Sequence, residues 1–210
     1  MASVTVRCLT EERKEVSPQP DITLILPAFN EVCTITGTIR EIIGYFDSRE
    51  LNYEIIVAAD GDDGTGERAA ELAGDNPAIK VISHKLRRGK GRGIREAVAI
   101  ATGKIIGYAD ADNKVPIEEY DKLAPWFEQG YDLVIGSRGL PGSVIERRQP
   151  LHRRIGSRGF SVFMHALVGL RDISDTQCGF KFFREHIARE LFRRQQIDGY
   201  MFDVEILALA

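Results

Sequence analysis

Cysteine is scarce in this sequence, which has three among 210 residues, at Cys8, Cys33 and Cys178. The number is odd and no C-x-x-C spacing occurs, so neither a disulfide framework nor a zinc knuckle is indicated, and a reducing cytosol is the expected setting. Long apolar runs are lacking as well. No stretch approaches the ~20 residues of a membrane span, and charges occupy the N-terminal region where a signal peptide would need an apolar core. Any membrane contact is therefore expected to be peripheral.

The chain also lacks a strong excess of charge of either sign. Its 28 basic and 31 acidic residues give a formal net charge of −3, whereas dedicated nucleic-acid binders are usually basic, so we expect no nucleic-acid partner. Neither G-x-G-x-x-G nor G-x-x-x-x-G-K-[ST] occurs, which disfavours a dehydrogenase and a P-loop enzyme. Apolar residues, by contrast, make up 43% of the chain. This is enough for a hydrophobic core and excludes a disordered protein.

Short β-branched runs alternate with helical patterns from Ile22 onward. The expected strands are Ile22–Pro27, Glu54–Ala59, Ile79–Ser83, Lys104–Ala109 and Asp132–Gly136, and the expected helices are Thr34–Tyr45, Thr65–Leu72, Gly93–Ala101 and Ile117–Phe127. Strands that are apolar throughout are buried on both faces. Their alternation with helices predicts an α/β fold with a mainly parallel central sheet flanked by helices.

Polar or charged residues follow nearly every expected strand. The segments are Pro27 to Glu31, Asp60 to Asp63, His84 to Arg95, Asp110 to Asn113, and Ser137 with Arg138. One acidic strand end could simply cap the next helix. Several polar ends on one edge favour a ligand site, because open α/β sheets bind ligands beyond the carboxyl ends of their strands.

Asp110 and Asp112 form a D-x-D motif directly after an expected buried strand. In extended backbone, residues i and i+2 point to the same side, so the two carboxylates converge. Mg²⁺ or Mn²⁺ would relieve their repulsion and could hold a diphosphate as well. A solvated turn remains the simple alternative for so short a motif.

Two basic stretches stand near other strand ends. The first, His84 to Gly93, includes Lys90 and leads into a helix, and such a loop suits phosphate oxygens. The second contains Arg138, Arg153 and further arginines, which are good phosphate receptors, and it precedes the apolar segment Phe160 to Val168. This combination is typical of an interfacial element facing anionic lipid, although a solvated loop and an ordinary core helix explain the composition equally well.

Several motifs together resemble one enzyme family. They are Pro27-Ala28-Phe29-Asn30-Glu31, Asp60-Gly61, Arg88-Gly89-Lys90-Gly91, Asp110-Ala111-Asp112, Val134-Ile135-Gly136-Ser137-Arg138 and Asp175-Thr176-Gln177-Cys178-Gly179-Phe180-Lys181. In this order they resemble the family 2 inverting glycosyltransferases, and within them the dolichyl-phosphate or polyprenyl-phosphate glucosyl- and mannosyltransferases. The resemblance implies the GT-A fold and transfer of a sugar from a nucleoside diphosphate to a lipid phosphate.

The resemblance also implies roles for individual residues. Those bordering the nucleotide would be Pro27, Ala28, Asn30, Glu31, Asp60, Lys90, Asp110 and Ala111, and the metal would be held by Asp110 and Asp112. Arg138, Arg153 and Ser157 match positions that bind the acceptor phosphate. Asp112, Arg138 and Lys181 would act in catalysis, with Lys181 near the transferred sugar or phosphates. Asp203 aligns with the base used by relatives whose acceptor is a hydroxyl group.

Two features differ from the family pattern. The turn after the second strand, Asp60-Gly61-Asp62-Asp63, is one residue shorter than usual in the family. The family's nucleotide-binding role is therefore assigned to Asp60 and not to the two aspartates after it. Relatives also continue past the position of Ala210 with membrane-associated segments. We therefore expect a polar leader over residues 1–21 and a single catalytic domain over residues 22–210, with the apolar run Val204 to Ala210 suggesting a C-terminal truncation.

The leading functional hypothesis is metal-dependent, inverting transfer of glucose from UDP-glucose to dolichyl or polyprenyl phosphate, with GDP-mannose as the second-choice donor. Mg²⁺ or Mn²⁺ would be the cofactor. The expected location is the cytoplasm, at the cytoplasmic face of a membrane. One alternative is a glycosyltransferase that acts on a hydroxyl acceptor in surface polysaccharide synthesis. Another is a non-catalytic module that binds sugar nucleotides. The sequence leaves the oligomeric state open.

Overall fold

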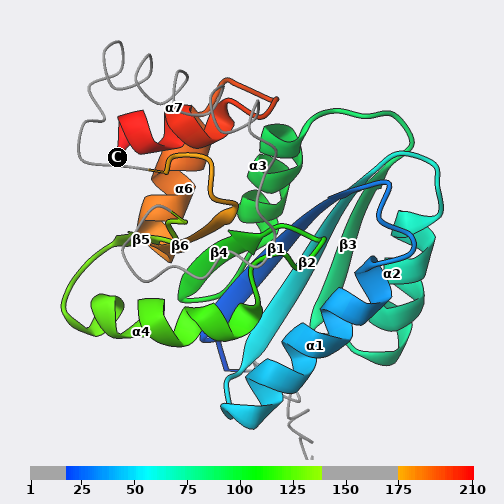
Figure 1. Cartoon of the computed structure of the whole chain (residues 1–210), viewed down its shortest axis with the longest axis horizontal. Coiled ribbons are helices and arrows are strands. Elements are labelled where there is room, and N and C mark those ends of the chain that lie inside the picture. Colours follow the sequence, from blue (N-terminus) through cyan, green and yellow to red (C-terminus); the bar gives the residue numbers. More distant parts are fainter. Residues whose placement is uncertain (1–17, 139–174) are drawn as a thin grey trace, which may run out of the picture.

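The computed structural model of the chain describes residues 18–138 and 175–210. Within these ranges, six strands form one sheet in the order β3-β2-β1-β4-β6-β5 (Figure 1). The strands are β1 (Ile22–Phe29), β2 (Tyr53–Asp60), β3 (Ile79–His84), β4 (Ile105–Ala109), β5 (Leu133–Ile135) and β6 (Phe180–Arg184). The helices are α1 (Ile35–Ser48), α2 (Thr65–Asp75), α3 (Lys90–Ile100), α4 (Tyr120–Glu128), α6 (Glu185–Arg194) and α7 (Phe202–Leu209), with a 3₁₀ turn, η1 (Ile117–Glu119), before α4.

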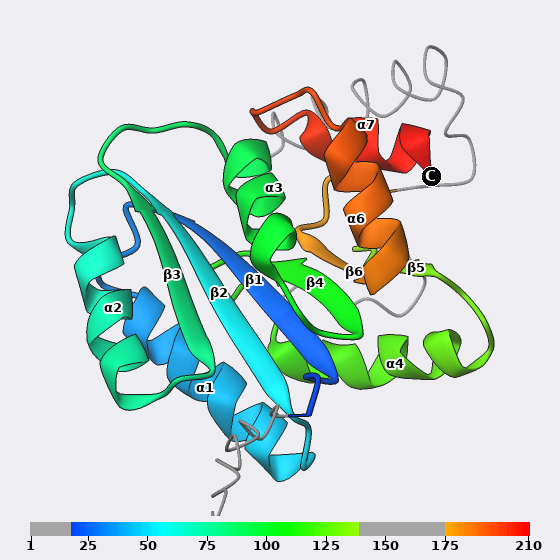
Figure 2. The same ribbon diagram turned by 180° about the vertical axis from the view of Figure 1, so that it is seen from behind.

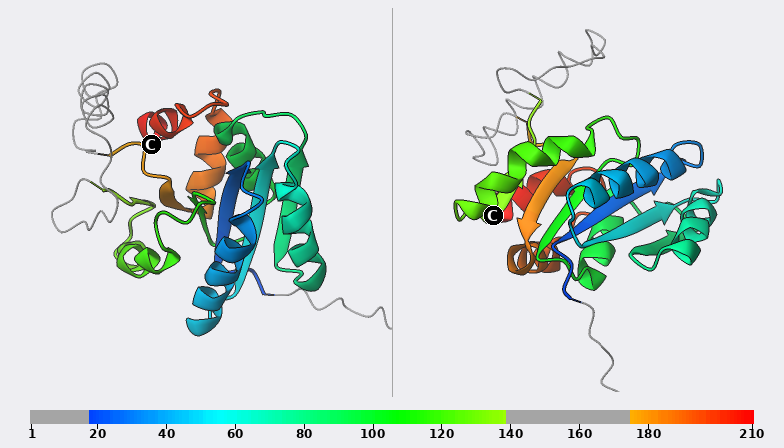
Figure 3. Two further views of the ribbon diagram at one scale, coloured as in Figure 1. Left: turned by 45° about the vertical axis from the view of Figure 1, so that its right-hand side comes forward. Right: turned by 90° about the horizontal axis from the view of Figure 1, so that it is seen from below.

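The helices cover both faces of the sheet. Helices α1, α2 and α4 lie on the face turned toward the viewer in Figure 1, and α3, α6 and α7 lie on the other, which Figure 2 shows from behind. The two views in Figure 3 show the same layers turned part of the way round from Figure 1 and from below. A sheet buried on both faces explains why β1 and β2 are apolar almost throughout. The α/β architecture expected from the sequence is confirmed.

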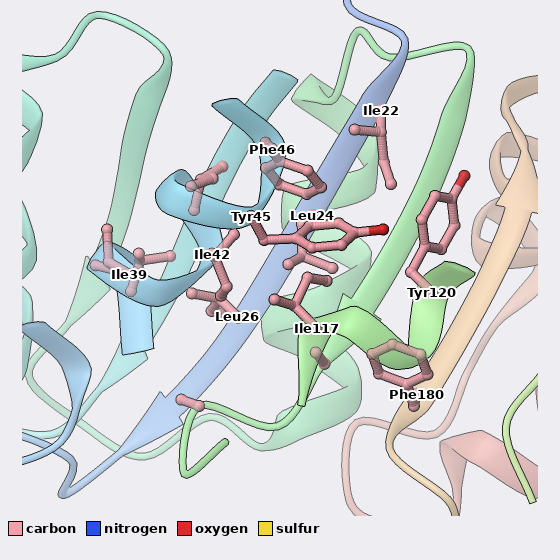
Figure 4. Close-up of a cluster of buried hydrophobic side chains, with 14 of the residues drawn as sticks. Ile22, Leu24, Leu26, Ile39, Ile42, Tyr45, Phe46, Ile117, Tyr120 and Phe180 are labelled. Carbon is pink, nitrogen blue, oxygen red and sulfur yellow. The ribbon is translucent and has the colours of Figure 1, made fainter. Parts of the chain in front are cut away.

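Successive residues of β1 enter opposite cores, as the pleat of a strand requires. Ile22, Leu24 and Leu26 pack with residues of α1 and η1, including Ile39, Ile42, Phe46 and Ile117 (Figure 4). Ile25 points the other way and packs with Ile94 and Val98 of α3. Both clusters consist mainly of buried side chains. Burial on this scale is the main force that holds the sheet between its helices.

All five expected strands are present, and they run parallel to one another. β1 pairs in parallel with β2 and β4, and β2 pairs in parallel with β3. β5 keeps the same direction because it is antiparallel to β6, which is itself antiparallel to β4. The strand missing from the sequence analysis is β6, the only reversed one among the described residues.

The reversal of β6 has a direct effect on the carboxyl edge of the sheet. Phe180, the first residue of β6, pairs with Ala109, the last residue of β4. The segment before Phe180 therefore lies at the edge where the parallel strands end. Residues from the last third of the chain reach the strand ends of the first half in this way.

Candidate active site

A cavity of about 280 Å³ lies at the carboxyl edge of the sheet. Its walls are formed by the ends of β1 and β2, the loop into α3, the residues after β4, the segment before β6 and the start of α7. The strand-end rule predicted a ligand site at this edge. Residues that lie far apart in the sequence thus share one concave surface.

Most of the residues predicted to bind the nucleotide and metal line this cavity. They are Pro27, Ala28, Glu31, Asp60, Lys90, Asp110, Ala111 and Asp112, and Asp203 lines it as well. Asn30 does not line it; this residue is exposed and has a positive φ of 60°. Arg153, Ser157 and the apolar segment Phe160 to Val168 fall outside the described residues.

Asp60 organises the basic loop after β3. Its Oδ2 atom accepts hydrogen bonds from the amides of Arg88 at 2.7 Å and Gly89 at 2.9 Å. Gly89 has a φ of 108°, and a Cβ there would lie 2.4 Å from the carbonyl oxygen of Asp198, so glycine is required. The sequence predicts that this loop binds phosphate, and its backbone amides could contribute hydrogen bonds. In this structure two of them bind Asp60 instead, which leaves Lys90 at the start of α3 as the cationic group of this loop that faces Asp110.

A lysine neutralises each aspartate of the D-x-D motif. Lys90 Nζ donates to Asp110 Oδ1 at 2.6 Å, and Lys114 Nζ donates to Asp112 Oδ2. The hydrogen bond to Asp112 raises the pKa of Lys114. The two carboxylates therefore face the cavity without the repulsion that an unpaired pair would suffer.

The donor set suits a metal ion that is shared with a substrate. Among residues 18–138 and 175–210, no group of three or more His, Cys, Asp or Glu side chains forms a metal cage. Mg²⁺ is usually held in proteins by one or two carboxylates together with water and phosphate oxygens. Asp110 and Asp112 fit that pattern, because they supply two carboxylates on a wall of a cavity with room for further oxygen ligands.

A buried charged cluster lies at the Asp203 side of the cavity. Asp203 Oδ1 accepts hydrogen bonds from Tyr108 Oη at 2.5 Å and from Lys181 Nζ at 2.6 Å. Burial and the adjacent Asp203 raise the pKa of Tyr108 well above its ordinary value, so the phenol stays a donor. The exposed fraction of Lys181 is 0%, and its ammonium group also donates to the carbonyl oxygens of Thr176 and Cys178. Lys181 thus supports the wall behind the cavity and is not among the cavity-lining residues.

Arg138 follows β5 and lies outside the cavity lining. Its guanidinium group binds both carboxylate oxygens of Asp175, at 2.7 and 3.0 Å. Burial alone would raise the pKa of Asp175, but the hydrogen bonds from Arg138 and from backbone amides outweigh it and lower the pKa. The Arg138 side chain remains 48% exposed, so a fixed and accessible cation stands at the end of β5.

Two side chains of the cavity, Gln177 and Tyr200, have no individual role predicted from the sequence, and a third, Arg87, belongs to the basic loop predicted to bind phosphate. The Arg87 guanidinium lies 4.4 Å from the centre of the Phe29 ring and donates to Tyr200 Oη at 3.4 Å. The cation–π contact with Phe29 and the hydrogen bond to Tyr200 together join the end of β1 to the segments before α3 and α7. Gln177 belongs to a motif that the sequence analysis noted, but nothing in the local pattern distinguishes it from its neighbours.

These elements define a sugar-nucleotide transferase fold, and comparison with known proteins gives its family. The chain belongs to Glycosyl transferase family 2, whose family model matches residues 23–192. Curated proteins that are similar to this chain include dolichyl-phosphate beta-glucosyltransferases. The one from Drosophila melanogaster is 34% identical over 98% of this chain and 67% of its own length. One from Trichomonas vaginalis is 33% identical over 90% of this chain and 59% of its own length. The human one is 28% identical over 92% of this chain and 64% of its own length. The chain thus spans about three fifths to two thirds of these relatives.

Solved structures share the fold. Glucosyl-3-phosphoglycerate synthase from Mycobacterium tuberculosis, crystallised with Mn²⁺, UDP and glucosyl-3-phosphoglycerate, matches 90% of this chain and 64% of its own with a TM-score of 0.66 and 23% identity. A mannosyltransferase from Pyrobaculum calidifontis in complex with GDP-Man and Mn²⁺ matches 85% of this chain and 47% of its own with a TM-score of 0.54 and 21% identity. These matches confirm the expected GT-A fold.

Proposed function

We propose that the chain transfers glucose from UDP-glucose to dolichyl or polyprenyl phosphate, with inversion at the anomeric carbon and with the help of Mg²⁺ or Mn²⁺. The observation that carries this proposal is the meeting of Asp60, Lys90, Asp110 and Asp112 in one cavity at the carboxyl edge of the sheet. The names of the curated relatives support the choice of glucose and dolichyl phosphate. The Mn²⁺ and UDP of the structural neighbour support the choice of cofactor and nucleotide.

The order of the strands suggests how the donor lies. Pro27, Ala28 and Asp60, at the ends of β1 and β2, would border the nucleoside, together with Asn30 and Glu31, which follow β1. Asp110 and Asp112, after β4, would hold the metal. When bound, the metal would neutralise charge that develops on the departing diphosphate. Lys90 would then be available to bind a phosphate oxygen, because the cation would take its place beside Asp110.

The acceptor chemistry needs positive charge more than it needs a base. A phosphate monoester has a second pKa near 6, so it is an anionic nucleophile at neutral pH. One of its oxygens would attack the anomeric carbon as the bond to the diphosphate breaks, and UDP would leave with the electron pair. Arg138, together with Arg153 and Ser157, would position this anion beside an anionic donor.

The direct test is incubation of the protein with Mg²⁺ or Mn²⁺, a panel of sugar nucleotides and a short polyprenyl phosphate. We expect a glucosylated lipid phosphate, identified by its mass, with UDP-glucose as the best donor. If only GDP-mannose gave a product, a mannosylated lipid phosphate, the donor would be GDP-mannose and not UDP-glucose. Tight metal-dependent binding of the nucleotide without turnover on any lipid phosphate would instead favour the non-catalytic binding module.

The hydroxyl-acceptor alternative would require a general base, for which Asp203 is the candidate. Asp203 lines the cavity, but its Oδ1 atom already accepts from Tyr108 and Lys181. An anionic acceptor has no need of this base, so the phosphate acceptor is favoured. Transfer to a free sugar, offered as acceptor in place of the polyprenyl phosphate, would reverse that preference.

A lipid phosphate acceptor would bring the chain to a membrane surface. Among the described helices, none combines the length and apolar character needed to cross a bilayer. From the lipid phosphate acceptor, we propose a peripheral contact at the cytoplasmic face, through Arg138 and the basic residues that follow it in the sequence. Flotation of the protein with vesicles that contain polyprenyl phosphate would test the contact.

A further inference from the structure

The segment before β6 is held in place by more bonds than a simple connection needs. Lys181 Nζ donates to the carbonyl oxygen of Thr176 at 3.0 Å and of Cys178 at 2.6 Å. The amide of Gln177 donates to Asp175 Oδ1 at 3.2 Å. The backbone on both sides of Gln177 is thus fixed by groups that are themselves in ion pairs, Lys181 with Asp203 and Asp175 with Arg138.

The same segment packs tightly against the metal-binding motif. The amide of Asp110 donates to the carbonyl oxygen of Gly179 at 3.2 Å. A Cβ atom on Gly179 would lie 2.4 to 2.5 Å from the carboxylate atoms of Asp110, so only glycine permits this approach. Gln177 is therefore presented beside Asp110 by a turn that has little freedom to move.

Gln177 itself lines the cavity, and its carboxamide is not fully used. Its Nε2 atom is buried and has no hydrogen-bond partner within the described part of the chain. A buried amide donor without a partner destabilises the chain, because it has lost its hydrogen bonds to water and gained none in return. The last side-chain torsion of glutamine has a broad and roughly two-fold profile, so the carboxamide can rotate and turn its nitrogen toward the cavity. This rotation breaks no hydrogen bond of the nitrogen, because the nitrogen makes none with the residues that the structure describes. An oxygen acceptor on a ligand would then satisfy it.

The order of the sheet indicates which part of the ligand that is. β2 and β1 come first, then β4 with Asp110 and Asp112, and then β6 with Gln177 before it. A donor with its nucleoside at β1 and β2 and its diphosphate at β4 places its sugar next to the β6 side. On the basis of the proposed function, we propose that Gln177 is a specificity-determining residue whose amide donates a hydrogen bond to a hydroxyl oxygen of the transferred hexose.

The assignment also gives the residues of the motif from Asp175 to Lys181 separate roles. Lys181 and Asp175 act as positioning residues that hold the backbone around Gln177, and Gly179 allows the close approach to Asp110. Gln177 then supplies the contact with the ligand. This division of roles follows from the burial of Lys181 and the accessibility of Gln177 from the cavity.

The test compares the same nucleotide with and without the sugar. UDP and UDP-glucose are titrated into the full chain in the presence of Mn²⁺ by calorimetry, with the wild type and Gln177→Leu. Loss of one neutral hydrogen bond should weaken UDP-glucose binding by about 3- to 10-fold and leave UDP binding unchanged. The matched control is Gln129→Leu, at an exposed position after α4, which should change neither affinity. Thermal unfolding of each variant verifies that it is folded.

Equal weakening of UDP and UDP-glucose by Gln177→Leu would overturn the proposal, because the contact would then lie with the nucleotide or with the fold. Unchanged affinity for both ligands would overturn it as well. A wild-type chain that binds neither ligand would contradict the proposed function itself. If the wild type binds both ligands but Gln177→Leu gives one of the two contrary results, only the Gln177 assignment fails and the proposed function stands.

Discussion

The ammonium group of Lys181 lies 2.6 Å from Asp203 Oδ1, and the two side chains are 0% and 3% exposed. The pair links β6 to α7, and Tyr108 of β4 donates to the same carboxylate oxygen. A buried charge is stable only when it is paired and hydrogen-bonded. This one contact therefore connects the end of the sheet to the last described helix directly behind the cavity.

Removal of Lys181 should destabilise the protein strongly. Lys181→Met leaves Asp203 buried without its counter-charge, and we expect a loss of about 3–5 kcal/mol in the free energy of unfolding. Urea denaturation measures this value. Lys122→Met, which removes an exposed ion pair with Glu119, should change stability by less than about 0.5 kcal/mol. Similar losses in the free energy of unfolding of the two variants would show that the buried Lys181 pair stabilises the fold no more than an exposed pair does.

The double variant Lys181→Met with Asp203→Leu should recover part of the stability lost in Lys181→Met. It replaces a buried ion pair by apolar side chains and leaves no unpaired charge. A double variant as unstable as the single one would mean that the lost hydrogen bonds, from Lys181 to the carbonyl oxygens and from Tyr108 to Asp203, carry the effect rather than the ion pair.

Asp112→Ala should abolish transfer without unfolding the chain. Asp112 is partly exposed and lines the cavity, so its loss removes a proposed metal ligand but little packing. We expect a fall in kcat/KM of roughly 100-fold or more, which corresponds to several kcal/mol of transition-state stabilisation. The control is Asp62→Ala, which alters an exposed carboxylate of the turn after β2 that does not line the cavity. Full activity in Asp112→Ala would contradict the metal role.

Gly179→Ala should separate activity from stability. The new methyl group would displace the carboxylate of Asp110, which is the mobile end of a side chain, so activity should fall further than the free energy of unfolding. Gly44→Ala is the control, since nothing lies within 4 Å of a Cβ at this exposed position in α1. This control should keep its activity and gain about 0.5–1 kcal/mol. Parallel measurement of glucosyl transfer and urea denaturation tests both expectations.

The Arg138–Asp175 pair should make stability depend on acidic pH. The pKa of Asp175 is lowered in the folded chain, so the unfolded chain binds more protons as the pH falls. The stabilisation is complete above the ordinary aspartate pKa of 3.8 and is lost as the pH falls through the lower folded value. Asp175→Asn should therefore be less stable than the wild type at pH 6, and the difference should shrink toward pH 3. A difference that stays constant over this range would contradict the expectation.

Much of the site could be predicted because the strand rule needs only local patterns. β1, β2 and β4 are apolar runs that end in Asn30-Glu31, Asp60 and Asp110, and the parallel sheet brings these ends together. β6 is hard to predict because its sequence, Phe-Lys-Phe-Phe-Arg, places a lysine at the second position of a buried five-residue strand. That lysine becomes compatible with burial only through Asp203, 22 residues further along the chain.

Long-range contacts account for the other residues that escaped prediction. Tyr200 reaches the cavity through its contact with Arg87, across 113 residues of sequence. The orphaned amide of Gln177 depends on the packing of a whole turn and has no signature in composition or spacing. Positions whose role depends on a distant partner carry no local signal, whereas strand ends do.

The antiparallel placement of β6 between β4 and β5 also has a consequence for synthesis on the ribosome. β4 ends at Ala109 and its partner begins at Phe180, so about seventy residues must be translated before the outer edge of β4 is paired. An unpaired hydrophobic strand edge is prone to aggregation, and pairing across such a separation is slow. The emerging chain is therefore most vulnerable between the completion of β4 and the arrival of β6, and chaperone dependence should be greatest for nascent chains of intermediate length.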